Sequence, residues 1–168
     1  MNARPPILIL GATGMLGSAL VQVSRARKLP YTALTRESCD ALRVEPDDLP
    51  LLKGQVVINA MGLINRRLGV DPEAHFWRIN GLWPRRLADC CERKGAKLIH
   101  ISTDCVFDGN LSPHDETARP SARDLYGQSK AQGEPANALV IRTSIIGPEA
   151  NHHYSLMAWL LGHADGRS

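Results

Sequence analysis

The chain has 168 residues and a formal net charge of +3, so we expect one domain with a core of its own. Its hydrophobic content of 43% with only 5% aromatic residues is typical of α/β proteins with aliphatic strands. The arginine pairs Arg66-Arg67 and Arg85-Arg86 are separated, which argues against nucleic acid or a membrane surface as a partner. The sequence shows no signal peptide, no apolar stretch near the roughly 20 residues that span a bilayer, and no CxxC motif. We therefore expect a reduced, soluble, cytoplasmic protein without a metal site.

Short aliphatic runs alternate with helical patterns, as in a parallel sheet that helices cover on both faces. Strands are expected at 7–10, 31–34, 56–60, 97–102 and 139–144, with a weaker strand at 39–44. Leu16, Leu20 and Val23 follow the first strand at helical spacing. This alternation predicts the α/β class.

The turn after the first strand reads "GATGMLG" and places glycines at 11, 14 and 17. Glycines here allow a tight turn, close approach of a pyrophosphate, and a helix whose N-terminus faces the phosphate charge. A glycine-rich turn without a ligand is the alternative. The motif predicts a Rossmann-type doubly wound sheet in which the cofactor contacts Gly11, Thr13, Gly14, Met15, Leu16 and Gly17.

The end of the second strand indicates which dinucleotide is bound. Dinucleotide folds usually carry an acid about 20 residues past the glycines, where it binds the ribose hydroxyls. Here Thr35 and Arg36 come first, and the acid Glu37 only follows. A guanidinium suits a 2′-phosphate, so the sequence favours NADPH over NADH.

A second long helix is expected after Asp71-Pro72, a pair typical of an N-cap and first helical turn. Gly81 and Pro84 should bend this helix. Its apolar residues recur at Phe76, Ile79, Trp83, Leu87 and Cys90. The segment 108–121 is rich in turn formers and should be the longest loop.

The fourth strand ends on the polar residues "STDC", and Tyr126 and Lys130 follow four residues apart on one helix face. Tyr126 could protonate a carbonyl oxygen as hydride arrives, if a neighbouring ammonium lowers its pKa from about 10. The alternative is a surface tyrosine beside a surface lysine. His100, inside the strand, is interpreted as a hydrogen-bonded core residue.

Seven segments in order make the chain resemble an extended short-chain dehydrogenase/reductase, and most closely the dTDP-4-dehydrorhamnose reductase family. They are "GATGMLG", "VVINAMG", "IN" at 79–80, "ISTDCVFDG", "ETARP", "LYGQSKAQGE" and "IRTSIIG", between residue 7 and about 147. The resemblance implies an NADPH-dependent reductase that acts on the 4-keto group of a nucleotide-linked deoxysugar in dTDP-rhamnose biosynthesis. It leaves open whether the chain forms a homodimer.

The resemblance also implies roles for individual residues. Thr103 would hydrogen-bond the substrate carbonyl, Tyr126 would donate the proton, and Lys130 would hold the nicotinamide ribose and tune Tyr126. Asn80 would support the proton relay, and Ser102 is a weaker stand-in for Thr103. Further cofactor contacts are expected at Asp40, Asn59, Ala60, Met61, Gly62, Tyr126 and Lys130, and further substrate contacts at Asp104, Arg142 and Ser144. Glu134 is interpreted as structural.

Cys105 replaces the tyrosine of the STDYVF segment that many of these reductases carry. The related dehydratases have Thr-Asp-Glu here, so the chain should not be a dehydratase. GDP-fucose synthases carry a catalytic cysteine two positions after their serine, and Cys105 lies two positions after Thr103, which would make the chain an epimerase/reductase. The alternative is that Cys105 packs as a small buried hydrophobe.

The family continues well beyond residue 168. Residues 1–150 are expected to form the NAD(P)-binding domain, and residues 151–168, with one amphipathic helix, to begin a shortened substrate-binding region. A second functional hypothesis follows from this: a non-catalytic NADP-binding or regulatory subunit, because the regulatory subunit of methionine adenosyltransferase is similar to these reductases.

Overall fold

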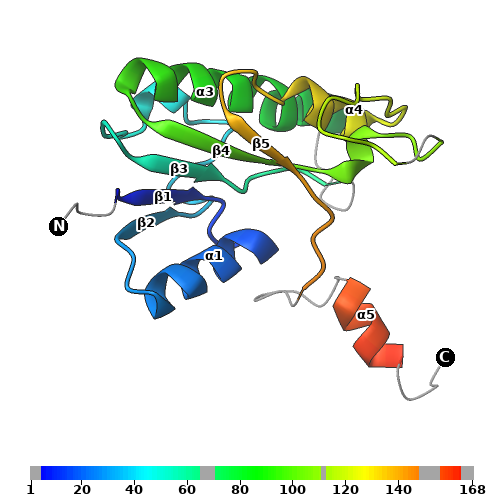
Figure 1. Ribbon diagram of the computed structural model, residues 1–168, viewed down its shortest axis with the longest axis horizontal. Helices are drawn as coiled ribbons and strands as arrows, with labels where there is room; N and C mark the ends of the chain where they lie inside the picture. The colour runs from blue at the N-terminus through cyan, green and yellow to red at the C-terminus, as the bar shows by residue number, and fades with distance from the viewer. Residues whose placement is uncertain (1–4, 65–70, 111–112, 148–155, 164–168) are drawn as a thin grey trace.

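The computed structural model describes residues 5–64, 71–110, 113–147 and 156–163. Five parallel strands form one sheet in the order β2-β1-β3-β4-β5 (Figure 1). The strands are β1 (Ile7–Leu10), β2 (Tyr31–Leu34), β3 (Val56–Asn59), β4 (Lys97–Ser102) and β5 (Leu139–Arg142). The predicted α/β class is confirmed, and three strands have the predicted bounds. The predicted strands at 56–60 and 139–144 end one and two residues earlier.

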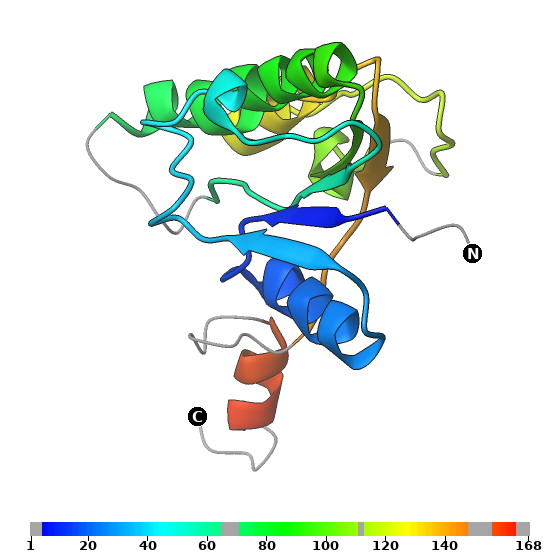
Figure 2. The ribbon, with the colours of Figure 1, turned by 90° about the vertical axis from the view of Figure 1, so that its left-hand side faces the viewer.

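The sheet has helices on both faces. α1 (Met15–Ala26) lies on one side, and α3 (Trp83–Lys94) and α4 (Leu125–Gln132) lie on the other, as both views show (Figures 1 and 2). The chain moves from β1 to β2 in one direction across the sheet and from β3 to β4 in the other. Right-handed crossovers in opposite directions place the helices on opposite faces. The carboxyl ends of β1 and β3 therefore meet at a topological switch point, where such sheets bind ligands.

The core lies between the sheet and α3. Leu8, Leu10 and Val57 from the strands are at most 2% exposed, and so are Trp83 and Leu87 of α3. Along β3 and β4 every second residue is buried, so each strand presents one face to α3. Burial of these apolar side chains is the main stabilisation of the fold.

The predicted weak strand at 39–44 is wrong. The backbone bonds locally there, with the amides of Cys39 and Val44 donating to the carbonyls of Thr35 and Asp40, each at 2.8 Å. Cys39 and Ala41 are nevertheless buried in the core. The apolar residues that suggested a strand are therefore the buried side chains of consecutive turns.

The predicted bend of the second long helix takes the form of a π-helical segment. α2 (Pro72–Phe76) leads into the π-helix η2 (Trp77–Leu82), which continues as α3 with Pro84 in its first turn. Asp71 caps α2 as predicted, since its carboxylate accepts from the amide of Ala74 at 3.3 Å. Isolated π-helical turns inside α-helices are frequent at functional sites.

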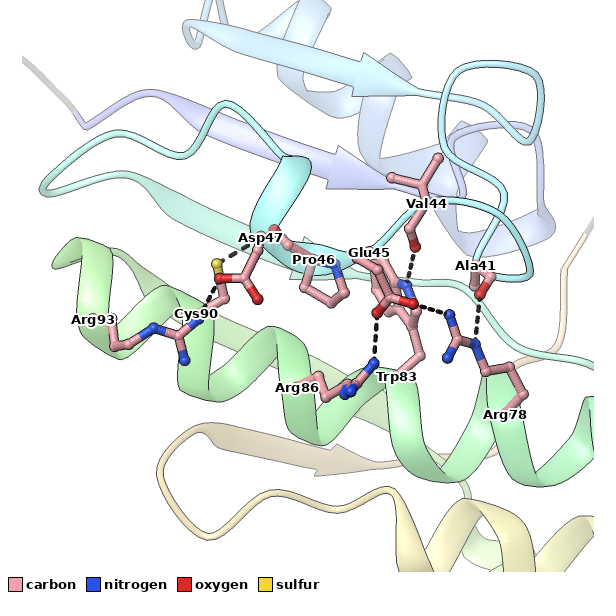
Figure 3. A network of polar contacts seen from close by, with 10 residues as sticks. All are labelled: Ala41, Val44, Glu45, Pro46, Asp47, Arg78, Trp83, Arg86, Cys90 and Arg93. Atoms are coloured by element: carbon pink, nitrogen blue, oxygen red, sulfur yellow. Dashed lines mark hydrogen bonds and ion pairs between the residues drawn. The ribbon is translucent and has the colours of Figure 1, made fainter.

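Residues 44–47, which lead into the 3-10 helix η1 (Pro46–Asp48), are fastened to η2 and α3 by polar contacts (Figure 3). The Trp83 indole donates to the carbonyl of Val44 at 2.8 Å, and Glu45 pairs with Arg86 at 2.7 Å and also with Arg78. The Cys90 thiol donates to the carbonyl of Pro46, and Asp47 pairs with Arg93. The ion pairs lie at the surface, where such pairs contribute about 1 kcal/mol or less, so the buried indole contact is the main anchor.

The remaining segments are a long loop and a terminal helix. The loop predicted at 108–121 is confirmed for the residues that the structure describes there. α5 (Leu156–His163) exposes Leu156, Trp159, Leu160 and Leu161 by more than half. Its apolar side chains surround the helix, so the expected amphipathic pattern is wrong. Within the described ranges, no helix has the length and apolar character needed to cross a membrane.

Candidate active site at the carboxyl edge of the sheet

The glycine-rich turn has the geometry that a dinucleotide requires. Gly11 adopts φ +77°, and its amide donates to the carbonyl of Leu34 at 3.1 Å. A Cβ at Gly17 would lie 2.1 Å from the Gly11 carbonyl oxygen, and a Cβ at Gly11 would lie 3.0 Å from the Ala60 carbonyl. These two positions therefore exclude side chains, as the predicted turn requires.

The N-terminus of α1 is open to an anion. Gly14 is the N-cap, and among the described residues no side chain caps the helix and no acid lies in its first turn. The first helical amides have no intrahelical acceptor, and the helix dipole favours negative charge there. Together with the tight turn, this end fits the pyrophosphate of a bound dinucleotide.

Arg36 lies just after β2, where the ribose of such a cofactor would be expected. Its side chain is 72% exposed, and its Nε is 3.5 Å from the carboxylate of Asp40. The other oxygen of Asp40 accepts from the amide of Leu42 at 3.0 Å. Asp40 is thus held by its own turn, while the Arg36 guanidinium faces solvent and is accessible to a phosphate.

The polar end of β4 forms a compact cluster with the segment that follows β5. Thr103 Oγ1 accepts from the amide of Cys105 at 3.2 Å and donates to Asp104 at 3.2 Å. Ser144 Oγ donates to the other oxygen of Asp104 at 2.5 Å. These hydrogen bonds, with Ser144 as the largest cause, lower the pKa of Asp104, which is therefore ionised at neutral pH.

Tyr126 reaches this cluster from the first turn of α4. Asp124 caps the helix by accepting from the amide of Gly127 at 3.0 Å, and the Tyr126 ring packs edge-on against Phe76. Burial raises the pKa of Tyr126, the negative charge of Asp104 raises it further, and a hydrogen bond with Thr103 opposes both. The predicted fall of this pKa is wrong, because the nearby charges identified as its causes are negative.

Lys130 follows one turn later and is only 4% exposed, so the alternative of a surface lysine is wrong. Its Nζ donates to the carbonyl of Ile101 at 2.7 Å, beside the end of β4. Burial lowers its pKa to about 8, although the carboxylate of Glu134 acts in the opposite direction. The ammonium is thus held inside the fold, where its charge is costly.

Asn80 connects two parts of the site from the π-helical segment. Its side chain accepts from the Leu63 amide at 2.8 Å and donates to the Leu63 carbonyl at 3.0 Å and to Ser129 Oγ at 3.2 Å. A Cβ at Gly133 would lie 1.8 Å from the Asn80 carbonyl oxygen, so α4 approaches this segment very closely. Asn80 therefore fixes the segment after β3 to the helix that carries Tyr126 and Lys130.

Arg142 is held by contacts within the fold. Its guanidinium binds both oxygens of Glu134, at 2.9 and 2.7 Å, and donates to the carbonyl of Ala118 at 3.0 Å. It also lies over the ring of Phe107, 5.1 Å from the centroid. These contacts fasten the loop after β4 to the segment that follows α4, and the assignment of Arg142 as a substrate residue stays a prediction. The structural interpretation of Glu134 is confirmed.

Two neighbouring residues resolve alternatives that the sequence leaves open. Ser102 is buried and donates to Glu134 at 2.7 Å, so it faces away from Thr103 and is no substitute for it. Cys105 is exposed, with its thiol 3.7 Å from Asp104, so its interpretation as a buried hydrophobe is wrong.

The other cysteines, Cys39, Cys90 and Cys91, are free and buried. In the described segments, no group of three or more potential metal ligands is found.

Comparison with known proteins decides the family. The family described as RmlD substrate binding domain matches residues 5–164, nearly the whole chain. The chain belongs to this family. Its parallel sheet, glycine-rich turn and buried Lys130 are therefore those of a member of the RmlD family.

The relatives of this family member are named both as enzymes and as a subunit. A dTDP-4-dehydrorhamnose reductase of Mycobacterium tuberculosis (strain CDC 1551 / Oshkosh) is 33% identical over 149 residues, 82% of this chain and 49% of the relative. Methionine adenosyltransferase 2 subunit beta of Xenopus tropicalis is 31% identical over 160 residues, 83% of this chain and 46% of the relative. The chain thus spans about half the length of these curated relatives.

A solved structure confirms the Rossmann-like architecture. A Bacillus anthracis dTDP-4-dehydrorhamnose reductase in complex with NADP superposes on this chain with a TM-score of 0.80. The superposition covers 98% of this chain and 61% of the Bacillus anthracis chain. At 21% identity this likeness shows the fold alone. The RmlD family member therefore has a sheet of the kind that holds NADP in that neighbour.

Proposed function

We propose that this RmlD family member binds NADPH and reduces the 4-keto group of a nucleotide-linked deoxysugar, as a dTDP-4-dehydrorhamnose reductase does. The observation that carries the proposal is the convergence of Thr103, Tyr126 and Lys130 at the sheet edge that also carries the open N-terminus of α1. Relatives of that name support the substrate class. We further propose that residues 1–150 are the cofactor domain and that residues 151–168 begin a substrate region.

The chemistry needs a hydride and a proton. When bound, the reduced nicotinamide supplies the hydride to the keto carbon. Thr103 Oγ1 hydrogen-bonds the keto oxygen, and the Tyr126 hydroxyl gives its proton to that oxygen as the negative charge develops. A raised pKa keeps the Tyr126 phenol protonated before the reaction, which is the form that donates. Lys130, one helical turn further along α4, would hold the nicotinamide ribose.

The proposed cofactor contacts follow from the turn and from the segment after β3. The amides at the start of α1 would bind the pyrophosphate, and Arg36 would pair with the 2′-phosphate. Asn59, Ala60, Met61 and Gly62 would border the nicotinamide, between the glycine-rich turn and Lys130. This set is supported by two short approaches: a Cβ at Gly11 would lie 3.0 Å from the Ala60 carbonyl, and a Cβ at Gly62 would lie 4.0 Å from Lys130 Nζ.

A second candidate is a non-catalytic NADP-binding subunit. It is favoured by the likeness to methionine adenosyltransferase 2 subunit beta. A role for Cys105 as acid or base in an epimerase/reductase is a variant of the first candidate, supported by the exposed thiol beside Asp104.

Fluorescence titration of the purified chain with NADPH and with NADH tests the cofactor proposal. Saturable binding that is tighter for NADPH would support both the glycine-rich turn and Arg36. Equal affinities would refute the assignment of Arg36, and absence of binding would refute the cofactor site. Assays with 4-keto sugar nucleotides then separate the enzyme from the binding subunit.

A further inference from the structure

His100, in β4, is fully buried, and the hydrogen bonds around it determine which ring nitrogen carries the proton. Its Nδ1 lies 3.1 Å from the side-chain amide nitrogen of Asn59 on the neighbouring strand. The amide oxygen of Asn59 accepts from the backbone amide of Met61 at 3.1 Å, which fixes the orientation of the Asn59 amide. Asn59 Nδ2 is therefore the donor and His100 Nδ1 the acceptor, so the ring proton is on Nε2.

The segment that Asn59 holds is central to the candidate site. Ala60 and Met61 contact the glycine-rich turn, since a Cβ at Gly11 would lie 3.0 Å from each of them. At the next residue, a Cβ on Gly62 would lie 3.6 Å from Asn80 Oδ1 and 4.0 Å from Lys130 Nζ. Residues 60–62 thus join the turn expected to hold the pyrophosphate to the lysine expected to hold the ribose.

The second ring nitrogen of His100 shows that stability alone does not account for this residue. Among the described residues, Nε2 is the buried side-chain polar atom that lacks a hydrogen-bond partner. A buried donor without a partner destabilises the folded state. The ring also stays neutral, because burial and the Lys130 ammonium lower the pKa of His100 to about 3. The lone pair of Nδ1 therefore remains available to Asn59.

We propose that His100 is a positioning residue for the cofactor-binding segment 60–62. Its Nδ1 fixes the Asn59 amide, and the oxygen of that amide holds the Met61 amide in place beside the glycine-rich turn. Without the acceptor, the Asn59 N–H would be buried and unpaired, and the amide would rotate and release Met61. The inference rests on the proposed function, since it concerns NADPH binding.

The test compares NADPH titrations of the whole chain with thermal unfolding. His100→Leu removes both ring nitrogens, so it exchanges one unpaired donor for another and should leave the thermal midpoint nearly unchanged. NADPH binding should weaken about tenfold, as expected for one buried hydrogen bond in a positioning role. His100→Asn should restore most of the affinity, because its amide oxygen can take the place of Nδ1.

Two controls separate positioning from general destabilisation. Leu98→Val alters the buried residue two positions earlier on the same face of β4, so it should lower the midpoint without changing NADPH affinity. In an Asn59→Ala background, His100→Leu should have no further effect on affinity, because it acts through Asn59. Unchanged affinity in His100→Leu, no rescue by His100→Asn, or additive effects in the double variant would overturn the inference.

Amide hydrogen exchange without cofactor distinguishes this inference from the proposed function. The Met61 amide should exchange faster in His100→Leu than in the wild-type chain or in Leu98→Val. A wild-type chain that does not bind NADPH refutes the proposed function, and the exchange of Met61 then decides whether His100 positions the segment. Equal exchange in all three proteins would refute the role of His100.

Discussion

Tyr126 is held in the form that a proton donor needs before the reaction. Burial raises its pKa, and the negatively charged Asp104 nearby raises it further. Lys130, one helical turn further along α4, donates to the carbonyl of Ile101, and the nearby charges that act on the pKa of Tyr126 are negative. The surroundings of Tyr126 thus keep its phenol protonated, which is the form that the proposed reaction requires.

Tyr126→Phe should therefore abolish turnover while leaving NADPH binding intact. The loss expected for a removed general acid is about 10²- to 10⁴-fold in kcat. Steady-state assays with a 4-keto sugar nucleotide and an NADPH titration measure the two effects. Tyr31→Phe, in β2, is the matched control and should keep full activity. Unchanged kcat in Tyr126→Phe would contradict the assignment of Tyr126 as the acid.

Lys130 should make stability depend on pH in the alkaline range. Its pKa is lowered from 10.5 to about 8 in the fold, so between these values the unfolded chain binds the additional proton. Stability from this group therefore rises with pH from about 8 to 10.5, by about 3 kcal/mol at most. Below pH 8 the group is protonated in both states and its full destabilising effect remains.

Denaturant unfolding of the wild-type chain and Lys130→Met at several pH values measures this contribution. The free energy of unfolding of the wild-type chain should increase relative to that of Lys130→Met as the pH rises from 8 to 10.5. The comparison cancels the opposite trend of Cys91, whose pKa burial raises to about 12. A difference that stays constant over this range would show that Lys130 is not buried as a charged group.

Several site residues are predictable from sequence because they follow strand ends or share a helix face. Thr103 comes directly after β4, and Tyr126 and Lys130 are one turn apart on α4. The contacts of Arg142 are not predictable, because its partner Glu134 follows α4 and reaches the end of β5 only in the folded chain. The hydrogen bond between Asn59 and His100 cannot be predicted from the sequence either, because neither residue indicates that β3 and β4 are neighbouring strands.

At the scale of elements, aliphatic runs predict the strands well because parallel strands are covered on both faces. The same signal fails at 39–44, where buried turns also carry apolar residues. The bend near Gly81 is predictable from its glycine and proline, but its π-helical form is not. It coincides with hydrogen bonds from Asn80 to Leu63 and to Ser129, which lie 17 and 49 residues away.

Arg142→Ala should destabilise the fold without affecting NADPH binding. The pair with Glu134 is largely buried, with side chains 23% and 11% exposed, and removal of one partner leaves a buried charge. Such losses cost about 3 kcal/mol. Thermal unfolding and NADPH titration measure the two quantities. Arg123→Ala is the matched control, because its pair with Asp108 is 3.7 Å long and Arg123 is 82% exposed. Weaker NADPH binding in Arg142→Ala at unchanged stability would contradict this prediction and place Arg142 at the cofactor site.

At the scale of the whole molecule, the two faces of the sheet differ. The side chains of β3 and β4 that face α3 are buried, whereas Leu139 and Ile141 of β5 are 58% and 40% exposed on the other face of the sheet. Ile146, at 67%, and the leucines of α5 are exposed as well. The matching family members are about twice as long. Asn59 and His100, which position the candidate cofactor segment, lie on the face toward α3. Variants of these residues therefore test cofactor binding without altering the exposed face.

A ligand that binds only the folded chain should stabilise the whole molecule. At 100 times its dissociation constant, NADPH should add about 2.7 kcal/mol and raise the thermal midpoint in a concentration-dependent way. NADH at equal concentration should raise it less, because Arg36 would lack a 2′-phosphate to pair with. Arg36→Ala should lower NADPH affinity about tenfold, the loss of one charge-assisted contact, and leave NADH affinity unchanged. Arg43→Ala, an exposed arginine of the same region, is the control and should retain the preference. Equal midpoint shifts by the two cofactors in the wild-type chain would show that Arg36 does not select NADPH.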